Sequence, residues 1–399
     1  MNKNYLEKFK FDELYTMSSG ISSTKEQAGH GFPFVSFSTI FNNYFLPDVL
    51  PDLMQTSIKD RESCSVLEGD VFLTRTSETP DELAMSSVAL KDYPNATFSG
   101  FAKRLRPINK GIVYPKYMAF YLRSPYFRKV INNNTIMTLR ASFNEDMFSF
   151  LELYLPKYNE QVKIGDLLCL LEKKIQLNEK INNNLLKIVD TIYQEFVFSN
   201  RARKSEFKVQ NMLNNDLYSL IKPGLKHFDT KTYYATSEVN GMNISNGWTV
   251  TYENRESRAN MAPTLYSVWF AKMKNSIKHL FLNNEMLNFI DNSILSTGFY
   301  GLQCDKISFE YVASVIHNSN FEKLKDVLSH GATQQGIGDD DLQNMKLLVP
   351  TQELLIAYHN KTAPIFSLIS KNINENCSLT KLRNYLLPLL MNGQVEIKD

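Results

Sequence analysis

Leu151-Glu152-Leu153-Tyr154-Leu155-Pro156 and Met345-Lys346-Leu347-Leu348-Val349-Pro350 are two copies of one pattern in a chain of 399 residues. The offset between them, from Pro156 to Pro350, is 194 residues. The same offset, without a gap, aligns Tyr117-Met118-Ala119 with Tyr311-Val312-Ala313, Phe127 with Phe321, Phe143 with Ile337, and Asp146 with Asp340. With small gaps, Ser99-Gly100-Phe101 resembles Thr297-Gly298-Phe299, and Glu13-Leu14-Tyr15 resembles Asp216-Leu217-Tyr218. Such self-similarity indicates a duplicated domain.

Each copy of the pattern is followed by a stretch with helical periodicity. Apolar residues and asparagines recur there in alternating steps of four and three, the heptad signature of a helix that packs on another helix. The shared pattern predicts an antiparallel coiled coil whose asparagines fix the register at a cost in stability. Replacing Asn178 and Asn372 by leucine is therefore expected to raise stability and loosen register. The seam residues are Leu171, Ile175, Asn178, Asn182, Leu185, Val189, Ile192 and Phe196, then Ile365, Ile369, Asn372, Asn376, Leu379, Arg383, Leu386 and Leu390.

Two points about these helices stay open at the level of sequence. Each helix could instead cover only its own domain. Pro364 and Pro388 also interrupt the second stretch, because proline lacks a backbone donor and clashes with the preceding turn. We expect the second helix either to begin near Pro364, with Thr362 as its cap, or to kink there, and to bend or fray at Pro388.

The stretches that precede the helices predict mixed α/β domains. Phe34-Val35-Ser36-Phe37 is expected to begin a strand, because Pro33 can precede a strand but not occupy its middle. Asp70-Val71-Phe72-Leu73-Thr74 is a second candidate strand. The predicted fold class is α+β, with two similar mixed α/β domains separated by two long helices in an antiparallel coiled coil. The expected boundaries are 1–155 and 206–349 for the domains, and 156–205 and 350–399 for the helical regions.

The overall composition indicates a globular protein outside membranes. It is 43% hydrophobic and 22% charged, and no apolar run reaches the roughly 18 residues of a membrane-spanning helix. The N-terminal residues 1–8 are charged and lack the apolar stretch of a signal peptide, so a cytoplasmic location is expected. The net charge of +2 is low for a dedicated DNA-binding protein. Cys64, Cys169, Cys304 and Cys377 are scattered, which predicts neither a zinc site nor disulfides.

Several catalytic motifs are missing from the sequence. It has no Pro-Pro pair, which excludes the Asn/Asp-Pro-Pro-aromatic element of amino-methyltransferases, and no Gly-Lys-Ser/Thr phosphate loop. The serine-rich stretch 18–23 has no adjacent base and no nucleophile elbow, so we interpret it as a loop. The six histidines are far apart in sequence, and no metal site is expected. The chain is thus predicted to be non-catalytic on its own.

The order of domain, helix, domain, helix resembles the specificity subunit of type I restriction-modification enzymes. Ser18-Ser19-Gly20-Ile21-Ser22, Phe34-Val35-Ser36-Phe37 and Phe41-Asn42-Asn43 are similar to the opening of a first target-recognition domain in that family. Glu68-Gly69-Asp70-Val71-Phe72-Leu73-Thr74-Arg75 is also similar. Leu153-Tyr154-Leu155-Pro156 with Asn159-Glu160-Gln161, and Leu347-Leu348-Val349-Pro350-Thr351-Gln352-Glu353, resemble the two passages from recognition domain into conserved helix. The likeness covers nearly the whole chain.

The resemblance implies a DNA-reading protein within a larger complex. Each target-recognition domain would bind one half of a split site in double-stranded DNA, and the antiparallel helices would act as a ruler between the halves. Two methyltransferase (modification) subunits would dock on the helices, and restriction/translocase subunits would join them. S-adenosylmethionine, ATP and Mg are then expected in the partner subunits, and none of them in this chain.

Candidate DNA-contacting residues are side chains that can reach base edges or phosphates. Gln334 and Gln335 follow Gly331 in a polar turn, with Gln334 at the repeat position of Arg140, and glutamine can bond an adenine edge bidentately. In the first domain the candidates are Ser22, Ser23, Lys25, Arg75, Thr76, Lys103, Arg104 and Arg140, and in the second they are Lys231, Tyr233, Asn254, Arg255, Arg258, Tyr300, Gln334 and Gln335.

Two other functional classes compete with this hypothesis. One is a two-domain protein-interaction scaffold without DNA specificity, in which the helices only dimerise the protein. DNA binding through several phosphates weakens steeply with salt, whereas an apolar protein interface changes little, so salt dependence separates the two. The other is a self-sufficient nuclease, which incubation of the purified chain with DNA and magnesium would detect.

Overall fold

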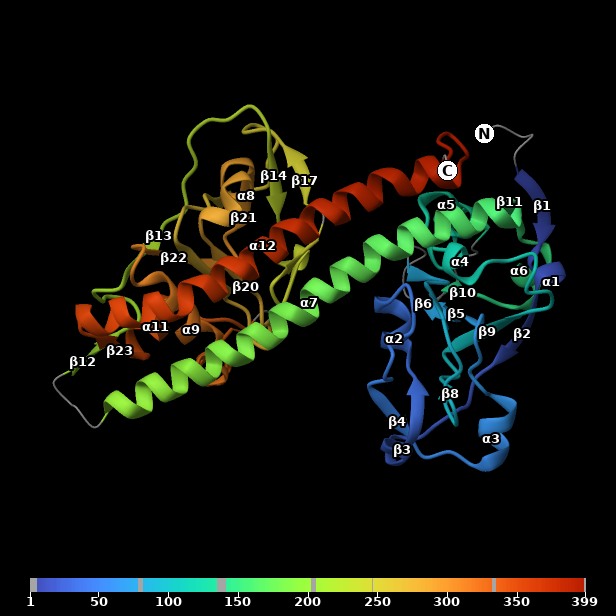
Figure 1. Cartoon of the computed structure of the whole chain (residues 1–399), viewed down its shortest axis with the longest axis horizontal. Coiled ribbons are helices and arrows are strands. Elements are labelled where there is room, and N and C mark those ends of the chain that lie inside the picture. Colours follow the sequence, from blue (N-terminus) through green and yellow to red (C-terminus); the bar gives the residue numbers. More distant parts are fainter. Residues whose placement is uncertain are drawn as a thin grey trace. The chain divides into compact units, whose positions relative to one another are not determined.

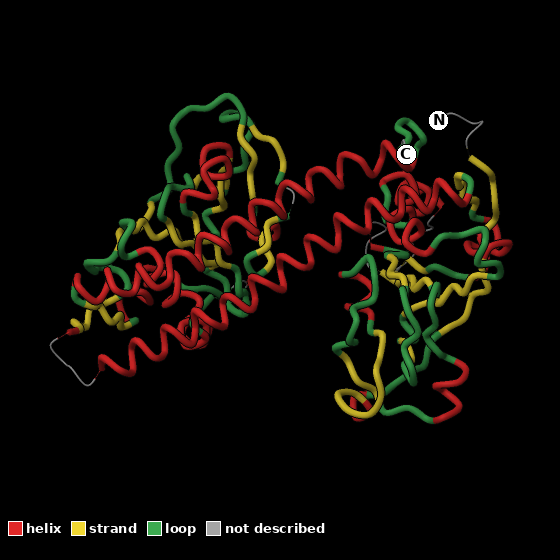
Figure 2. Tube along the Cα trace, in the orientation of Figure 1, coloured by secondary structure: helices red, strands yellow, loops and turns green. Residues whose placement is uncertain are grey.

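The computed structural model of the chain describes residues 6–77, 82–134, 141–201, 206–245, 247–331 and 335–397. The chain divides into two compact units, a first unit of Met1–Glu172 with Leu382–Asp399 and a second unit of Lys173–Lys381. Both units combine short strands with helices, and each also contains part of both long helices, α7 (Tyr158–Arg201) and α12 (Gln352–Met391) (Figures 1 and 2).

The first unit is built around a four-stranded antiparallel sheet. Its strand order is β2 (Tyr15–Ser19), β9 (Ala102–Pro107), β5 (Val71–Thr74) and β7 (Ser86–Val88). A smaller sheet has the order β4 (Asp52–Met54), β3 (Ala28–Val35) and β8 (Thr97–Phe98), with β3 and β8 parallel. Two strand pairs complete the unit, β1 (Leu6–Lys10) with β11 (Glu152–Pro156) and β6 (Thr76–Ser77) with β10 (Ala141–Ser142). Its short helices are α1 (Phe11–Leu14), α2 (Phe37–Asn42), α3 (Ile58–Ser63), α4 (Pro115–Tyr121), α5 (Pro125–Asn134) and α6 (Glu145–Phe150).

The four-stranded sheet of the first unit is covered on both faces. Val71, Leu73 and Leu105 pack in one cluster with apolar residues of α4 and α5, and the end of α12 contributes to that cluster. Phe72 and Ala102 pack in a separate cluster with Val35 and Phe98 of the smaller sheet. Because successive side chains of a strand point to opposite faces, the all-apolar run Val71–Leu73 suits a central strand buried on both sides.

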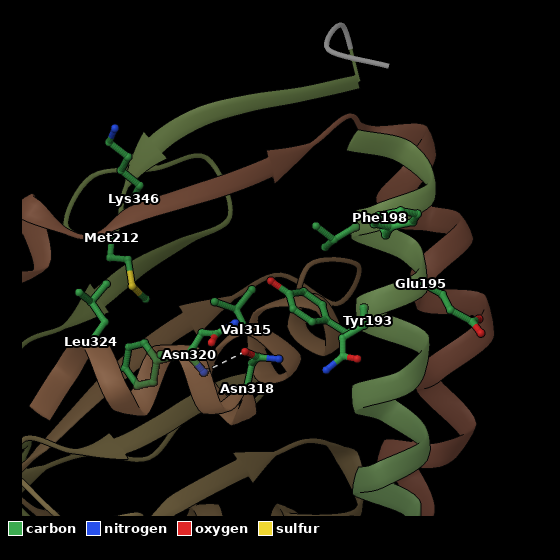
Figure 3. A pocket seen from close by; sticks show the side chains of 12 residues that line it. Tyr193, Glu195, Phe198, Met212, Val315, Asn318, Asn320, Leu324 and Lys346 are labelled. Atoms are coloured by element: carbon green, nitrogen blue, oxygen red, sulfur yellow. Dashed lines mark hydrogen bonds between the residues drawn. The ribbon is translucent and has the colours of Figure 1, made fainter. Parts of the chain in front are cut away.

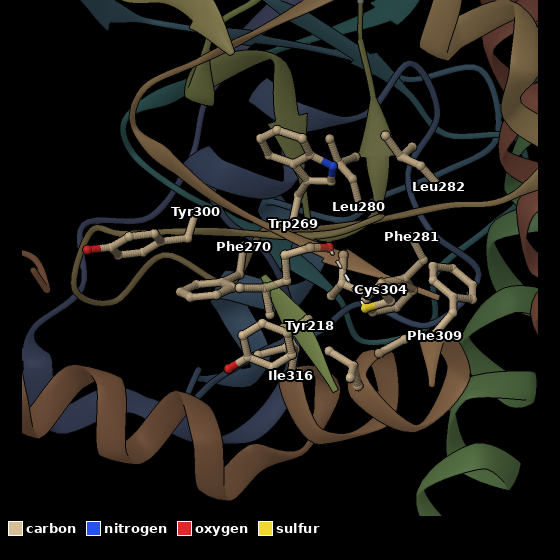
Figure 4. Packing of buried hydrophobic residues seen from close by; sticks show 14 of the residues in the cluster. Tyr218, Trp269, Phe270, Leu280, Phe281, Leu282, Tyr300, Cys304, Phe309 and Ile316 are labelled. Atoms are coloured by element: carbon tan, nitrogen blue, oxygen red, sulfur yellow. Dashed lines mark hydrogen bonds between the residues drawn. The ribbon is translucent and has the colours of Figure 1, made fainter. Parts of the chain in front are cut away.

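The second unit repeats this plan. Its main sheet has the order β13 (Tyr218–Ile221), β22 (Phe299–Cys304), β19 (Ser267–Ala271) and β20 (His279–Leu282). Trp269, Phe270 and Phe281 from this sheet pack with Phe309 in the core (Figure 4). The other strands form a sheet of β17 (Trp248–Val250), β14 (Lys231–Tyr234), β21 (Ser293–Ser296) and β18 (Ala259–Met261), and the pairs β12 (Phe207–Asn211) with β23 (Lys346–Pro350) and β15 (Val239–Asn240) with β16 (Asn243–Ile244). The short helices are α8 (Leu287–Asn292), α9 (Phe309–His317), α10 (Ser319–Leu328) and α11 (Asp339–Asn344).

The offset of 194 residues recurs in the element bounds. Adding 194 to the bounds of β11, α5 and α6 gives the bounds of β23, α10 and α11. Adding 194 to the first residues of α4 and α7 gives the first residues of α9 and α12. Upstream the offset changes. Arg75 N donates to Phe101 O (2.8 Å), and Lys272 N donates to Gly298 O (2.9 Å), so Phe101 corresponds to Gly298. The alignment of Gly100 with Gly298 in the sequence is therefore wrong by one residue.

The long helices pair antiparallel within the second unit, as predicted. Asn178 Nδ2 donates to Asn376 Oδ1 (2.9 Å), and Asn372 Nδ2 donates to Asn182 Oδ1 (2.8 Å). Residue numbers rise along one helix as they fall along the other. Val189 of α7 and Ile369 of α12 also enter the core of the second unit, so the helices both pair and cover this domain.

The second long helix does not begin near Pro364. The helix runs without a break from Gln352 to Met391. Thr362 lies inside it rather than capping it, and its Oγ1 donates to Tyr358 O (2.8 Å). Pro364 is exposed, and so is Asn360, whose carbonyl lacks a helical donor and can be solvated. Burial of Phe366 and Ile369 just beyond Pro364 holds the helical path.

The prediction that a strand begins at Phe34 is also wrong. β3 ends at Val35, and Pro33 lies within it, opposite Leu53 of β4. Ser36 then caps α2, since its Oγ accepts from Thr39 N (3.3 Å). The segment combines the end of a strand with a helix cap.

Candidate nucleic-acid interface

Arg75 and Lys103 line one hollow in the first unit. Arg75 follows β5, and Lys103 lies on β9 opposite Leu73. The carbonyl of Arg75 accepts from Phe143 N (2.8 Å), which brings the start of α6 to this place. The next candidate, Thr76, pairs with Ser142 in the short β6–β10 ladder. The hollow measures about 300 Å³ and is lined by Arg75, Lys103, Ser142, Phe143, Asn144, Glu145 and Asp146.

Lys103 is a buried cation whose ammonium has little compensation. The residue is 7% exposed, and its Nζ donates to Ser19 Oγ (2.9 Å). Within the described residues, no carboxylate lies at ion-pair distance from this ammonium. Burial lowers the pKa of Lys103, and the positive charge of Arg75 lowers it further, against a smaller opposing effect of Glu145. The two cations thus line the same hollow, and the positive charge of Arg75 acts on the ammonium of Lys103.

Arg104, the neighbour of Lys103, contacts a different part of the unit. Its Nη1 donates to Ser65 O (2.5 Å), and its guanidinium lies 5.4 Å from the centroid of the Phe98 ring. The residue is 8% exposed, and burial lowers the pKa of its guanidinium. Because alternate residues of a strand point to opposite faces, Lys103 and Arg104 cannot share one contact surface.

Ser22, Ser23 and Lys25 are exposed residues between β2 and β3. Lys25 opens the short 3₁₀ turn Lys25–Gln27, which Thr24 precedes with a capping box. None of these three residues is among the described residues that line the Arg75 hollow. Arg140, the remaining candidate of the first domain, lies outside the described residues.

The second unit has the corresponding position. Ile337 N donates to Lys272 O (3.1 Å), as Phe143 N does to Arg75 O, so Lys272 stands where Arg75 stands. Tyr300 lies on β22 opposite Phe270, in the place of Lys103. The Tyr300 hydroxyl donates to Asp339 Oδ1 (2.7 Å), and the Lys272 ammonium lies 4.3 Å from the centroid of the Tyr300 ring.

Charges at this second position are compensated. Lys222 Nζ lies 3.7 Å from Asp339 Oδ2, and Asp339 also acts on Lys272 by raising its pKa against a larger lowering by burial. Burial, followed by the hydrogen bond to Asp339, raises the pKa of Tyr300 above its ordinary value. Tyr300 and Asp339 together stand where the first unit has the ammonium of Lys103.

Gln335 lies next to this position and is exposed. Lys274 Nζ donates to Gln335 Oε1 (3.0 Å), and Lys274 N donates to Gln335 O (3.0 Å). The amide nitrogen of the side chain is therefore the group directed away from Lys274. Gln334 lies outside the described residues.

The remaining candidates lie on or near the sheet of β17, β14, β21 and β18 in the second unit. Lys231 is half-buried on β14, whereas Tyr233 is 1% exposed and packs edge-to-face on Trp248 at 4.9 Å. Asn254 Oδ1 accepts from Thr251 N (2.7 Å) in the following turn. Arg255 stacks on Tyr252, with its guanidinium 4.0 Å from the ring centroid, and Arg258 is exposed in the same loop.

Comparisons with known proteins agree on one family. Residues 5–187 match the family model described as the type I restriction modification DNA specificity domain. The MjaIX specificity subunit of Methanocaldococcus jannaschii is 21% identical over 82% of this chain and 84% of its own length, and the HindI specificity subunit of Haemophilus influenzae is 21% identical over 72% and 79%. The chain is thus similar to the type I restriction modification DNA specificity domain over residues 5–187, and to type I restriction enzyme specificity subunits over most of its length. A solved S subunit from M. genitalium shares the fold at a TM-score of 0.52 and 14% identity, over 98% of this chain and 97% of that one.

Two residues beside the candidate contacts were not selected from the sequence. Lys272 was overlooked because the gaps upstream of Tyr311 hid its correspondence to Arg75, although it belongs to a visible basic cluster with Lys274 and Lys278. Trp248, 40% exposed beside Tyr233, carries no local signal that separates it from a core tryptophan. An alignment of the two repeats by their strands, instead of by residue identity, would have matched Lys272 with Arg75.

A larger hollow of about 590 Å³ lies elsewhere in the second unit, where Tyr193 and Phe198 of α7 meet Met212, Val315 and Leu324 (Figure 3). It is mainly apolar and holds none of the candidate DNA contacts.

Among the described residues there is no group of three or more His, Cys, Asp or Glu side chains placed to hold a metal ion. The described helices also include none that is both long and apolar enough to cross a membrane.

Proposed function

We propose that this protein is the specificity subunit of a type I restriction-modification complex and reads a two-part site in double-stranded DNA, one half with each unit. The observation that carries the proposal is that one backbone plan presents different side chains at equivalent positions. Arg75 and Lys103 in the first unit correspond to Lys272 and Tyr300 in the second. Two units with one backbone plan and different polar side chains at equivalent positions would contact the two halves of a DNA site differently, which suits a site whose halves differ in sequence.

Catalysis in this proposal belongs to the partners. Two modification subunits dock on α7 and α12 and bind S-adenosylmethionine, and restriction/translocase subunits bind ATP and Mg. The complex acts in the cytoplasm, where it meets DNA. The lack of methyl-transfer and phosphate-loop motifs in the sequence supports this division of labour.

The test is an exchange of one recognition segment. The segment from Ile21 to Arg140 is replaced by that of another specificity subunit, and methylated sites are sequenced in cells that also express the modification subunits. One half of the methylated sequence should change while the other half stays the same. A change in both halves contradicts independent reading.

Two controls separate the competing classes. The purified chain with S-adenosylmethionine should transfer no methyl group, and incubation with DNA and magnesium should leave the DNA intact. Its affinity for a DNA duplex should fall steeply as salt rises, because phosphate contacts release counterions. Affinity that is independent of salt would favour the protein-interaction scaffold.

A further inference from the structure

The two equivalent positions differ in a way that assigns them different tasks. In the first unit, a hollow of about 300 Å³ separates Arg75 and Lys103 from the start of α6. In the second unit, the Tyr300 hydroxyl bonds Asp339, and Lys272 lies over the Tyr300 ring. The first-unit position therefore has two cations beside a hollow. At the second-unit position, the Lys272 cation and the Tyr300 hydroxyl already contact other groups of the protein.

We propose that Arg75 and Lys103 together hold one phosphate of the DNA backbone, and that the second unit has no counterpart of this phosphate site. The inference rests on the proposed function and deepens it. It makes Arg75 and Lys103 positioning contacts that set the first unit on the duplex without reading a base.

The physical reason is the cost of two neighbouring positive charges. Lys103 is buried with one hydroxyl as hydrogen-bond partner, and burial and Arg75 both lower its pKa. Such an ammonium gains more from an added anion than an exposed lysine does, because the Coulomb energy grows as the surroundings become less polar. An anionic oxygen between the two cations would also accept charge-assisted hydrogen bonds from both.

Glu145 and Asp146 line the same hollow and must be considered. Both are exposed, so water screens them more than it screens Lys103. Glu145 also fails to offset the combined effect of burial and Arg75 on the pKa of Lys103. Lys103 is therefore the buried charge of the hollow, whereas Glu145 and Asp146 are exposed.

The test measures salt dependence with the full chain assembled with its modification subunits. The probes are a duplex that carries the methylated site of the wild-type complex and a pool of random duplexes. The variants are Arg75→Gln and Lys103→Met, with Lys272→Gln as the matched control in the second unit. Arg75 is exposed and its carbonyl bond to Phe143 is unaffected by the side chain, so Arg75→Gln leaves the fold intact.

Each first-unit variant should weaken binding to both probes by the same factor, roughly tenfold, with the slope of log affinity against log salt smaller by about 1. Lys272→Gln should leave the slope unchanged. An unchanged slope in Arg75→Gln overturns the phosphate site, and so does a loss of selectivity at one base position, which would make Arg75 a base reader. If the wild-type complex bound no duplex, the proposed function itself would fail, which is a distinct result.

Discussion

Ile131 in the first unit and Lys325 in the second occupy the same place in the two copies, one turn before the ends of α5 and α10. Both side chains are fully buried. Lys325 Nζ lies 2.6 Å from Glu322 Oε2 and donates to Ser276 O (2.8 Å), and Glu322 Oε1 lies 2.8 Å from His279 Nε2. The first unit fills this place with a hydrocarbon, and the second fills it with a network of charges.

A second pair of positions shows the same contrast. Arg123 in the first unit corresponds to His317 in the second. The Arg123 guanidinium donates to four backbone carbonyls, those of Ser86, Ile40, Phe41 and Asn43. His317 instead packs edge-to-face on His279 at 5.9 Å. The backbone plan thus tolerates different interior chemistry at equivalent positions.

The largest expected effect comes from giving the second unit the residue of the first. Lys325→Ile leaves Glu322 buried with one partner fewer and removes the donor to Ser276 O. Breaking a buried ion pair on one side costs about 3–5 kcal/mol in the free energy of unfolding. This loss in the free energy of unfolding is measured by denaturant unfolding together with hydrogen exchange over residues 267–282.

Two further variants sharpen that result. Ile131→Val, the matched change in the first unit, should cost only about 0.5–1.5 kcal/mol. Combining Lys325→Ile with Glu322→Gln should recover part of the loss, because no unpaired carboxylate remains. If Lys325→Ile were as mild as Ile131→Val, the charged network would have no stabilising role.

The next largest effect is expected in the paired helices α7 and α12. The observed asparagine pairs reverse the change in stability that the sequence predicted for leucine replacements. Asn178 pairs with Asn376, and Asn182 pairs with Asn372. Replacing Asn178 and Asn372 together would leave a buried amide in each pair, so it should lower stability rather than raise it. Asn178→Leu alone should cost about 1–3 kcal/mol through the unsatisfied amide of Asn376.

The matched control removes a whole pair. Asn178→Leu with Asn376→Leu should be close to neutral, since replacing both partners by apolar groups removes the desolvation penalty. Thermal melting of the single and double variants provides the measurement. A single variant as stable as the wild type would show that the asparagine pair contributes nothing.

The smallest effect depends on pH and should appear only in the second unit. Burial, helped by His279, lowers the pKa of His317 to about 4 from 6.5, while Glu322 acts in the opposite direction. Asp190, with Oδ2 3.7 Å from His317 Nε2, is the carboxylate on the facing helix. Between pH 6.5 and 4 the unfolded chain binds a proton that the folded chain does not, so stability falls as pH falls. From pH 7 to pH 5 the loss is about 1–2 kcal/mol.

Comparison with His317→Gln isolates this contribution. The variant should lose less stability than the wild type over the same pH range, measured by denaturant unfolding at each pH. The first unit has arginine at the equivalent position, and its hydrogen exchange serves as the internal control. Equal pH dependence of the variant and the wild type would place the titration elsewhere.

The sequence predicted the fold well wherever the repeat has no gap. From Tyr117 onward one offset aligns the copies, and the heptads identify both helices and their antiparallel pairing. Upstream, insertions of a few residues hid the match of Lys272 with Arg75. Pro364 misled because a helix-breaking tendency was overridden by buried residues on either side of it.

The candidate site was less predictable for a different reason. Residue type shows which side chains can contact DNA, but not which way they point. Lys103 and Arg104 are adjacent and both basic, yet they lie on opposite faces of β9. Tyr233 was selected for its chemistry and lies in the core. Those contacts remain predictions until DNA binding is measured.

The division of the long helices between the units has a consequence for synthesis on the ribosome. Leu387, Leu390 and Met391, at the end of α12, belong to the apolar core of the first unit. They emerge only after all of residues 173–381 have been translated, on the order of 10–40 s later at about 5–20 residues per second. The domain that is made first is therefore the last to be completed. Until then its nascent core exposes an apolar surface that a chaperone can protect.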